Sequence, residues 1–200
     1  MSATTFTAKD VQELRRRTGA GMMDCKKALE ANGGDVEKAV EYLRKKGIAK
    51  AESRTGRATS EGLVGSYIHH NGKLGVLVEL NCETDFVART DDFQQLVRTI
   101  AEHVAAAAPL GVDKDSIPAE AVEKERRIAE EQASQSGKPD AIVQKMVEGK
   151  VESFYKEVAL LSQPWVREPK KTIADLIKEA SAKLGENIQV RRFVRFQLGE

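Results

Sequence analysis

Residues 62–81 read GLVGSYIHHNGKLGVLVELN, and they predict the centre of the fold. Two runs rich in Leu, Val, Ile and Tyr, residues 62–68 and 73–81, lie on either side of His69-His70-Asn71-Gly72. An Asn-Gly pair between two apolar runs is among the strongest local signals for a β-hairpin. We therefore expect two antiparallel strands joined by a turn at these residues.

A third strand is expected near the C-terminus, over residues 188–198. Apolar and polar side chains alternate there with the period of two that is typical of a half-buried strand. This strand can close a sheet with the hairpin, and the sheet is then three-stranded and mostly antiparallel. We expect one face of the strand to carry its apolar residues, which are Ile188, Val190, Val194, Phe196 and Leu198.

Helical patterns surround these strands. Apolar residues recur at helical spacing over residues 91–108, and again after Thr172, which can cap a helix that Gly185 closes. Between these two helices, residues 118–161 are helical with an interruption at Gly137-Lys138-Pro139. That region predicts a helical hairpin inserted into the body of the protein.

Residues 1–48 predict a separate small unit, here called the N-terminal module. Thr7 and Asp35 can cap the first and third of its short helices. Breaks that contain glycine, at residues 18–21 and 32–34, separate the three helices. A core of this size is only marginally stable alone.

The domain organisation follows from these patterns. Residues 49–60 lack apolar periodicity and predict a partly helical linker, so residues 61–200 form the core domain with its insertion at about 118–161. The predicted fold class is α+β: a small three-helix module, then a mostly antiparallel three-stranded sheet covered by helices.

Composition narrows the class of protein. The 32 basic and 31 acidic residues nearly cancel, which argues against direct nucleic-acid binding. Residues 1–58 hold 13 Lys and Arg against 8 Asp and Glu, whereas the remainder holds 19 against 23, so a mildly basic unit precedes a mildly acidic body. No apolar run approaches the roughly 18 residues of a membrane span, and residues 1–6 show no secretory signal. With only two cysteines, we expect a soluble cytoplasmic protein that touches no membrane.

Catalytic chemistry is not expected. His69 and His70 are adjacent in a predicted turn and make a poor metal pair. His103 falls on the polar side of its helix without an apparent partner, and Cys82 has no identifiable base, so a structural thiol is the favoured interpretation. The residues alone therefore give little support to the hypothesis that the protein is an enzyme.

Two other segments invite a functional interpretation. Residues 14–29, LRRRTGAGMMDCKKAL, place Met22 and Met23 side by side at a helix start, where both cannot face one small core. Flexible thioethers suit an adaptable binding surface, and the residues alone leave core and interface equally open. In residues 79–89, ELNCETDFVAR, the strand alternation ends and an Asp-Phe pair follows. From the residues alone a core anchor is the favoured role for Phe86, and an exposed aromatic tip is the alternative.

Taken together, the two segments resemble the signatures of the elongation factor Ts family of bacterial translation. Residues 14–29 match the first signature and residues 79–88 the second, and Arg191-Arg192-Phe193 near the C-terminus also agrees. The resemblance covers essentially the whole chain. It is to the short members, which have one core subdomain where longer members have two.

The resemblance implies a nucleotide-exchange factor for the GTPase elongation factor Tu, both GDP-bound and nucleotide-free. It implies that the protein is not an enzyme and needs no cofactor or metal of its own. It implies that the N-terminal module has a ubiquitin-associated-like fold and docks on the nucleotide-binding domain. The second segment would act near the magnesium site, where Phe86 enters an apolar pocket and Asp85 disturbs the groups that hold the metal. The residues expected to contact the partner are therefore Leu14, Arg15, Met22, Met23 and Lys26 from the module, and Asp85, Phe86, Val87 and Ala88 from the core.

The resemblance also raises the possibility of a homodimer in a 2:2 complex with elongation factor Tu, for which the final strand and the helical hairpin offer surfaces. A ubiquitin-associated-type peptide adaptor is an alternative function. It accounts for residues 1–47 and leaves the segment Thr84-Asp85-Phe86-Val87 without a role. Ribosome or RNA binding through the basic N-terminal helices is a second alternative, which the near-zero net charge disfavours.

Overall fold

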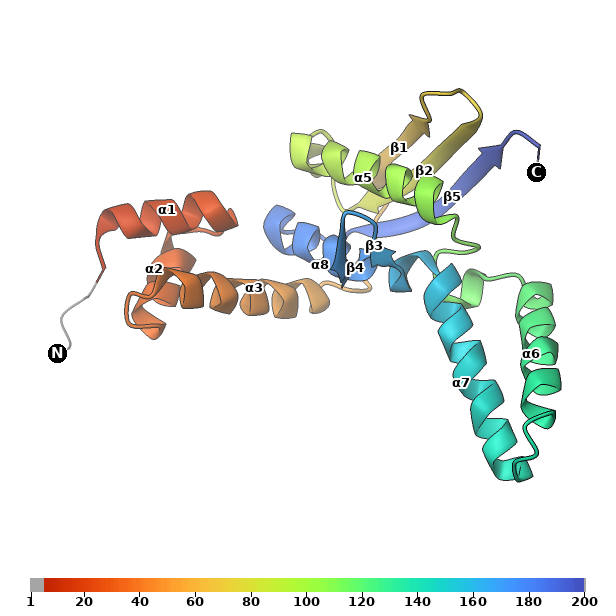
Figure 1. The fold of residues 1–200 in the computed structure, drawn as a ribbon. Helices are drawn as coiled ribbons and strands as arrows, with labels where there is room; N and C mark the ends of the chain where they lie inside the picture. The colour runs from red at the N-terminus through yellow and green to blue at the C-terminus, as the bar shows by residue number, and fades with distance from the viewer. Residues whose placement is uncertain (1–5, 200) are drawn as a thin grey trace.

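The computed structural model describes residues 6–199, and its N-terminal module consists of three helices (Figure 1). They are α1 (Ala8–Thr18), α2 (Met22–Ala31) and α3 (Val36–Glu52). The predicted caps are present: the Thr7 hydroxyl accepts from the Asp10 N–H, and the Asp35 carboxylate accepts from the Lys38 N–H at 3.0 Å. The prediction of no secretory signal rests largely on residues 1–5, which lie outside the described residues.

Helix α3 continues past Gly47 to Glu52 and so covers the start of the segment predicted as a linker. Its C-terminal half packs against α8 (Ile173–Leu184) of the core. Arg44 forms an ion pair with Glu179 at 2.6 Å, and Lys178 one with Glu52 at 3.1 Å. Gly47 allows the close approach, because a Cβ there would lie 3.0 Å from the Cβ of Ala182.

The sheet is three-stranded and antiparallel, which confirms the predicted fold class. Its strands β1 (Glu61–Ile68), β2 (Leu74–Cys82) and β5 (Gln189–Gln197) lie in the order β1-β2-β5. The hairpin turn forms at the predicted residues, where the Gly72 N–H donates to the His69 carbonyl at 2.8 Å. Gly72 has a φ of 67°, a left-handed conformation that glycine adopts without strain.

The predicted alternation of the last strand was wrong. Opposite β5, Glu79 pairs with Arg192 but the next residue, Leu80, pairs with Val190, so Arg191 is an extra residue in a β-bulge. A bulge changes the face on which the following side chains lie. Val190 is therefore buried in the core, whereas Val194 and Phe196 are exposed on the opposite face.

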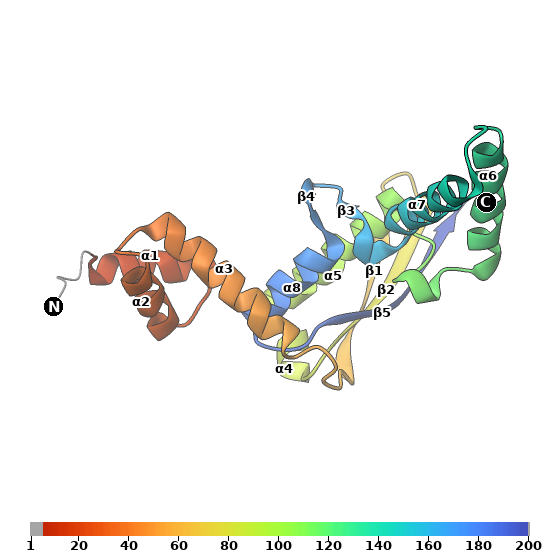
Figure 2. The same cartoon turned by 90° about the horizontal axis from the view of Figure 1, so that it is seen from below.

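Helices α5 (Asp91–Ala107) and α8 cover the inner face of the sheet (Figure 2). The buried side chains between them form the main core, including Val76, Val78 and Leu80 of β2 and Phe93, Ile100 and Val104 of α5. Strand β1 lies so close to α5 that a Cβ at Gly65 would be 2.1 Å from Cγ1 of Val97.

The interpretation of His103 as a surface residue was also wrong. The side chain is fully buried, its Nε2 lies 3.0 Å from Oε1 of Gln163, and its Nδ1 accepts from the Val166 N–H. Gln163 precedes a small ribbon that sequence patterns did not predict, made of β3 (Pro164–Trp165) and β4 (Glu168–Thr172). The turn between β3 and β4 reaches α5 here, where the Val166 N–H donates to His103 and Arg167 forms an ion pair with Glu102.

The predicted helical hairpin consists of α6 (Ala119–Ser134) and α7 (Asp140–Val158), with short 3-10 helices η1 (Lys114–Ser116) and η2 (Leu160–Ser162) at its base. Ala129, Ala133 and Val147 form its own small core. The hairpin and the N-terminal module project from opposite ends of the core domain (Figures 1 and 2). Among residues 6–199, no helix is long and apolar enough to span a membrane.

Candidate functional site

The segment after β2 folds into a single helical turn, α4 (Asp85–Ala88). Thr84 caps it, because its hydroxyl accepts from the Val87 N–H at 3.4 Å. Ala88 is buried and Val87 packs against the main core, so one side of the turn is anchored. The other side carries Phe86, whose side chain is 79% exposed.

The exposure of Phe86 contradicts the role of core anchor that the residues alone favoured. It agrees with the exposed tip implied by the family resemblance, and contact with a partner protein remains a prediction. Such exposure is costly in isolation, since burying a Phe side chain contributes about 1.5–3 kcal/mol. A large exposed aromatic on an anchored turn is a feature of binding surfaces.

Asp85 lies beside Phe86 and is engaged within the chain. Its carboxylate forms an ion pair with Arg89 at 2.8 Å, four residues along. The Arg89 side chain is 77% exposed and that of Asp85 is 43% exposed, and an ion pair this accessible to water contributes little to stability. The Asp85 carboxylate can therefore exchange Arg89 for another partner at small cost.

Glu186, in the turn between α8 and β5, holds the N-terminal end of α4 through hydrogen bonds. One carboxylate oxygen accepts the backbone N–H groups of Glu83 and Thr84, both at 3.0 Å, and the other accepts the Thr84 hydroxyl at 2.6 Å. Sequence reasoning missed this residue. It stands between Gly185 and Asn187 without any periodic or motif signal, and it is distant in sequence from Thr84.

Cys82 lies under the same turn and is not poised for chemistry. Its thiol is buried and donates to the Thr84 carbonyl at 3.1 Å. Burial and the nearby negative charge of Glu186 raise the pKa of the Cys82 thiol to about 11. The neutral thiol is a weak nucleophile, in keeping with the structural role expected from the sequence.

The N-terminal module exposes its methionines. Both methionines face solvent, with 43% of Met22 and 63% of Met23 exposed. Arg15 and Lys26 are exposed as well, and Lys26 is only loosely paired with Glu30 at 3.9 Å. Leu14 is fully buried in the core of the module, where it supports the surface from inside.

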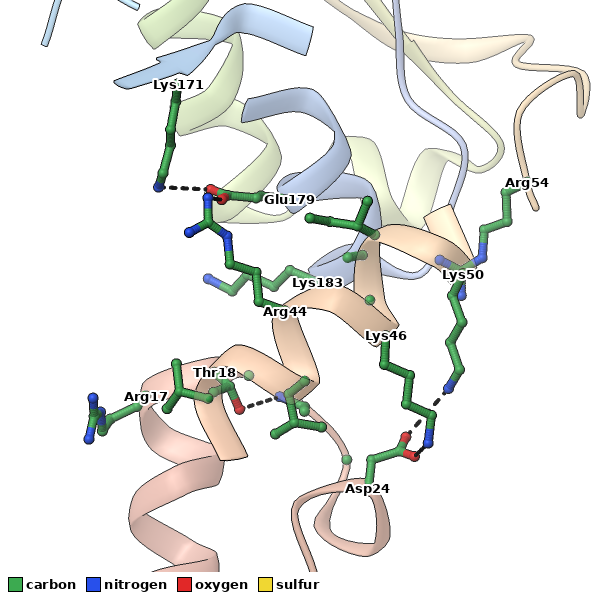
Figure 3. Close-up of a pocket in the computed structure, with 18 residues that line it drawn as sticks. Arg17, Thr18, Asp24, Arg44, Lys46, Lys50, Arg54, Lys171, Glu179 and Lys183 are labelled. Atoms are coloured by element: carbon green, nitrogen blue, oxygen red, sulfur yellow. Dashed lines mark hydrogen bonds and ion pairs between the residues drawn. The ribbon is translucent and has the colours of Figure 1, made fainter. Parts of the chain in front are cut away.

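A pocket of about 440 Å³ lies between the N-terminal module and α8 (Figure 3). Asp24 holds Lys46 and Lys50 at 3.0 and 3.6 Å, and Glu179 holds both Lys171 and Arg44. Each of these carboxylates is thus shared by two cations. The positively charged residues that line the pocket outnumber the two acidic ones, and they are Arg17, Arg44, Lys46, Lys50, Arg54, Lys171 and Lys183.

Large exposed apolar side chains therefore stand on two separate helical elements, Met22 and Met23 on α2 and Phe86 on α4. Within residues 6–199 there is no group of three or more His, Cys, Asp or Glu side chains that could hold a metal ion. His69 instead contacts the Tyr67 hydroxyl through Nδ1 at 2.9 Å.

Comparison with known proteins gives the family. The profile described as Elongation factor TS matches residues 6–200. An elongation factor Ts from Fervidobacterium nodosum is 58% identical over 98% of this chain and 99% of its own length. Those from Anaeromyxobacter dehalogenans and Carboxydothermus hydrogenoformans are 60% and 57% identical, over 98% of this chain and about 90% of theirs. The chain belongs to the elongation factor Ts family, whose members are translation elongation factors. Membership of this family implies a partnership with elongation factor Tu.

Proposed function

We propose that this chain accelerates the release of GDP from elongation factor Tu by pressing α4 into the region that holds Mg²⁺ and the phosphates. The observation that carries the proposal is Phe86, a large apolar side chain left exposed on an anchored helical turn. No bond is made or broken in this function. It is a shift in binding equilibria and in the barrier to release.

The proposed mechanism follows from thermodynamic linkage. GDP is held through Mg²⁺ and through backbone dipoles around the phosphates. A factor that binds best when these groups are displaced must weaken the binding of GDP, and GDP must weaken the binding of the factor by the same free energy. The Asp85 carboxylate would approach the metal-binding groups after it leaves Arg89, and Phe86 would occupy an apolar pocket beside them.

The size of the Phe86 contribution can be estimated. Each tenfold acceleration needs a barrier lower by about 1.4 kcal/mol, and burying one Phe contributes about 1.5–3 kcal/mol. Because most of the ring is exposed in the free chain, most of that amount is available on binding. Phe86 alone then accounts for an acceleration of GDP release of about 10- to 100-fold. Any larger acceleration requires the rest of the interface.

The N-terminal module would supply the second contact. Met22 and Met23 form an exposed apolar spot, with Arg15 and Lys26 on the same small module. Flexible thioethers adapt to a partner surface, and nearby cations favour acidic groups around it. Leu14 contributes by holding the helix that carries Arg15. Ala88 and Val87 contribute in the same way to the position of Phe86.

We further propose that a second copy covers the outer face of the sheet. Leu77 pairs with Val194 and Gly75 with Phe196 across β2 and β5, and Ile68 lies over Gly75 from β1. A contiguous apolar face on an otherwise solvated sheet favours packing against another sheet, and an identical copy presents the same face. The side chains involved are exposed, namely Val64, Ile68, Leu77, Val194, Phe196 and Leu198.

The exchange proposal is tested by release of fluorescent GDP from purified elongation factor Tu. The chain should accelerate release, and Phe86→Ala should reduce the maximal rate about 10- to 100-fold while much of the binding remains. Leu110→Ala, a truncation of another exposed apolar side chain, serves as control and should leave release unchanged. Unaltered GDP release at saturating concentrations of the wild-type chain would refute the function.

The dimer is tested separately by the mass of the chain in solution. Phe196→Arg puts a charge into the outer face and should convert a dimer to a monomer. A wild-type chain that is monomeric at micromolar concentration would rule out the second copy. It would leave the proposal for Phe86 intact, because α4 does not belong to that face.

A further inference from the structure

Two acidic residues cross-connect the segment before α4 and the turn before β5. Glu186 accepts from the backbone of Glu83 and Thr84, and Glu83 in turn accepts the Asn187 N–H at 2.7 Å. Each segment thus donates backbone hydrogen bonds to a carboxylate side chain of the other. The side-chain amide of Asn187 extends the network by donating to the Arg57 carbonyl at 2.9 Å.

The Glu186 contacts are arranged to orient α4. The Thr84 hydroxyl donates to Glu186 at 2.6 Å, and its oxygen is then directed to accept the Val87 N–H. A hydroxyl has one proton to donate, so its bond to Glu186 determines which lone pair faces the helix. The carboxylate therefore reaches the first turn of α4 through Thr84.

Helix α4 needs such support because it is only four residues long. A single helical turn fixes several backbone dihedrals for one hydrogen bond and does not persist alone. Packing of Val87 and Ala88 holds one side, but Phe86 points away from the core and has little packing of its own. Its direction depends on the backbone of α4 and hence on the anchor at Thr84.

Glu186 itself is held in place. Ser181, on the last turn of α8, donates its hydroxyl to the Glu186 carbonyl. The N–H of Gly185 donates to the Ser181 carbonyl at 3.0 Å and closes the helix, with Gly185 in the left-handed conformation. The anchor is thus attached to a rigid element of the core, and a charge-assisted hydrogen bond is stronger than a neutral one.

We propose that Glu186 is a positioning residue for nucleotide exchange, which holds α4 in the orientation that presents Phe86 to the partner. The proposal rests on the proposed exchange function. A group already fixed in its binding orientation loses less conformational entropy on docking. With the anchor in place, a larger share of the free energy of burying Phe86 is therefore available to lower the barrier to GDP release. Glu186 acts through Thr84 and α4 without contacting the partner.

The first test measures the anchor without the partner. In Glu186→Ala and Glu186→Gln variants, amide hydrogen exchange of Glu83 and Thr84 should become faster by about tenfold or more, since charged hydrogen bonds are lost. Gln retains the size of Glu and keeps the test available if the Ala variant folds poorly. Glu131→Gln, the same change on the exposed surface of α6, is the control and should leave both amides unchanged.

The second test asks whether Glu186 works through Phe86, with a double-mutant cycle on GDP release at saturating chain. Glu186→Ala should lower the maximal acceleration about tenfold when Phe86 is present, and less than about twofold in the Phe86→Ala chain. Equal losses in both backgrounds would overturn the proposal, because they would show that Glu186 acts elsewhere. Faster amide exchange with undiminished GDP release would also overturn it.

Failure of the exchange function gives a different result from failure of this inference. If the wild-type chain does not accelerate release, the function and the positioning role are both refuted. If the wild type is active and the Glu186 variants match it, only the positioning role is refuted.

Discussion

Replacing Gly65 by alanine should destabilise the core domain, because this glycine is where β1 meets α5. An added Cβ would lie 2.1 Å from Cγ1 of Val97, far inside van der Waals contact. The contacting atom belongs to a buried, β-branched side chain in the middle of the core, which cannot rotate away freely. Overpacking of this kind costs about 1–3 kcal/mol, so we expect the free energy of unfolding to fall by about 2 kcal/mol.

The structure also predicts how the loss is relieved. Val97→Ala alone should cost about 2 kcal/mol through lost burial and a cavity. The new methyl at residue 65 would lie 3.5 Å from the Val97 Cβ, an ordinary contact, so in the double variant it occupies the space of the removed Cγ1. The double variant should therefore be about as stable as Val97→Ala, with a coupling energy of about 2 kcal/mol.

The assay is urea unfolding followed by the fluorescence of Trp165, the single tryptophan, which packs against the main core. Gly149→Ala is the matched control, since no described atom near that α7 position lies within 4 Å of an added Cβ. It should stabilise the hairpin by about 0.5–1 kcal/mol through helix propensity. A Gly65→Ala chain as stable as wild type, or additive losses in the double variant, would refute the packing argument.

Three further predictions concern buried groups and the junction of the module with α8. Burial lowers the pKa of His103, so the unfolded chain binds more protons than the folded chain at acidic pH. The free energy of unfolding should therefore fall as the pH drops below about 6.5, and a His103→Gln chain should lose this dependence on pH. Burial raises the pKa of the Cys82 and Cys25 thiols, so a thiol reagent at pH 8 should label them only after unfolding; rapid labelling of the native chain would contradict this. Gly47→Ala should leave the free energy of unfolding nearly unchanged, since a gain of about 1 kcal/mol in helix propensity offsets the tight contact of the new Cβ with Ala182. The larger side chain of Gly47→Leu should separate α3 from α8 and so speed proteolysis near residue 53.

Local signals predicted most of the secondary structure. The caps at Thr7, Asp35 and Thr172 and the turn at Asn71-Gly72 depend on hydrogen bonds and dihedrals within a few residues. Such interactions are nearly independent of the rest of the chain. Helical spacing and strand alternation then indicated the α+β class, because each pattern has one face to bury.

The candidate site was only partly predictable for the opposite reason. His103 and Phe86 each follow an acidic residue and precede a valine on a helix, yet the first is fully buried and the second is 79% exposed. The turn between β3 and β4 contacts His103, whereas Phe86 remains exposed among the described residues. Whether a helix face is buried depends on elements that pack from elsewhere in the chain, and a local pattern does not contain them.

The sequence by itself determined the helices, the hairpin, the α+β class and the two signature segments, because short-range hydrogen bonding and periodicity encode them. Only the tertiary structure decided three things: the bulge at Arg191 that turns Phe196 outward, the exposure of Phe86, and the anchoring of Thr84 by Glu186. Each depends on register or contact between segments far apart in the chain. Such contacts are selected by the packing of the whole core, and no single segment specifies them.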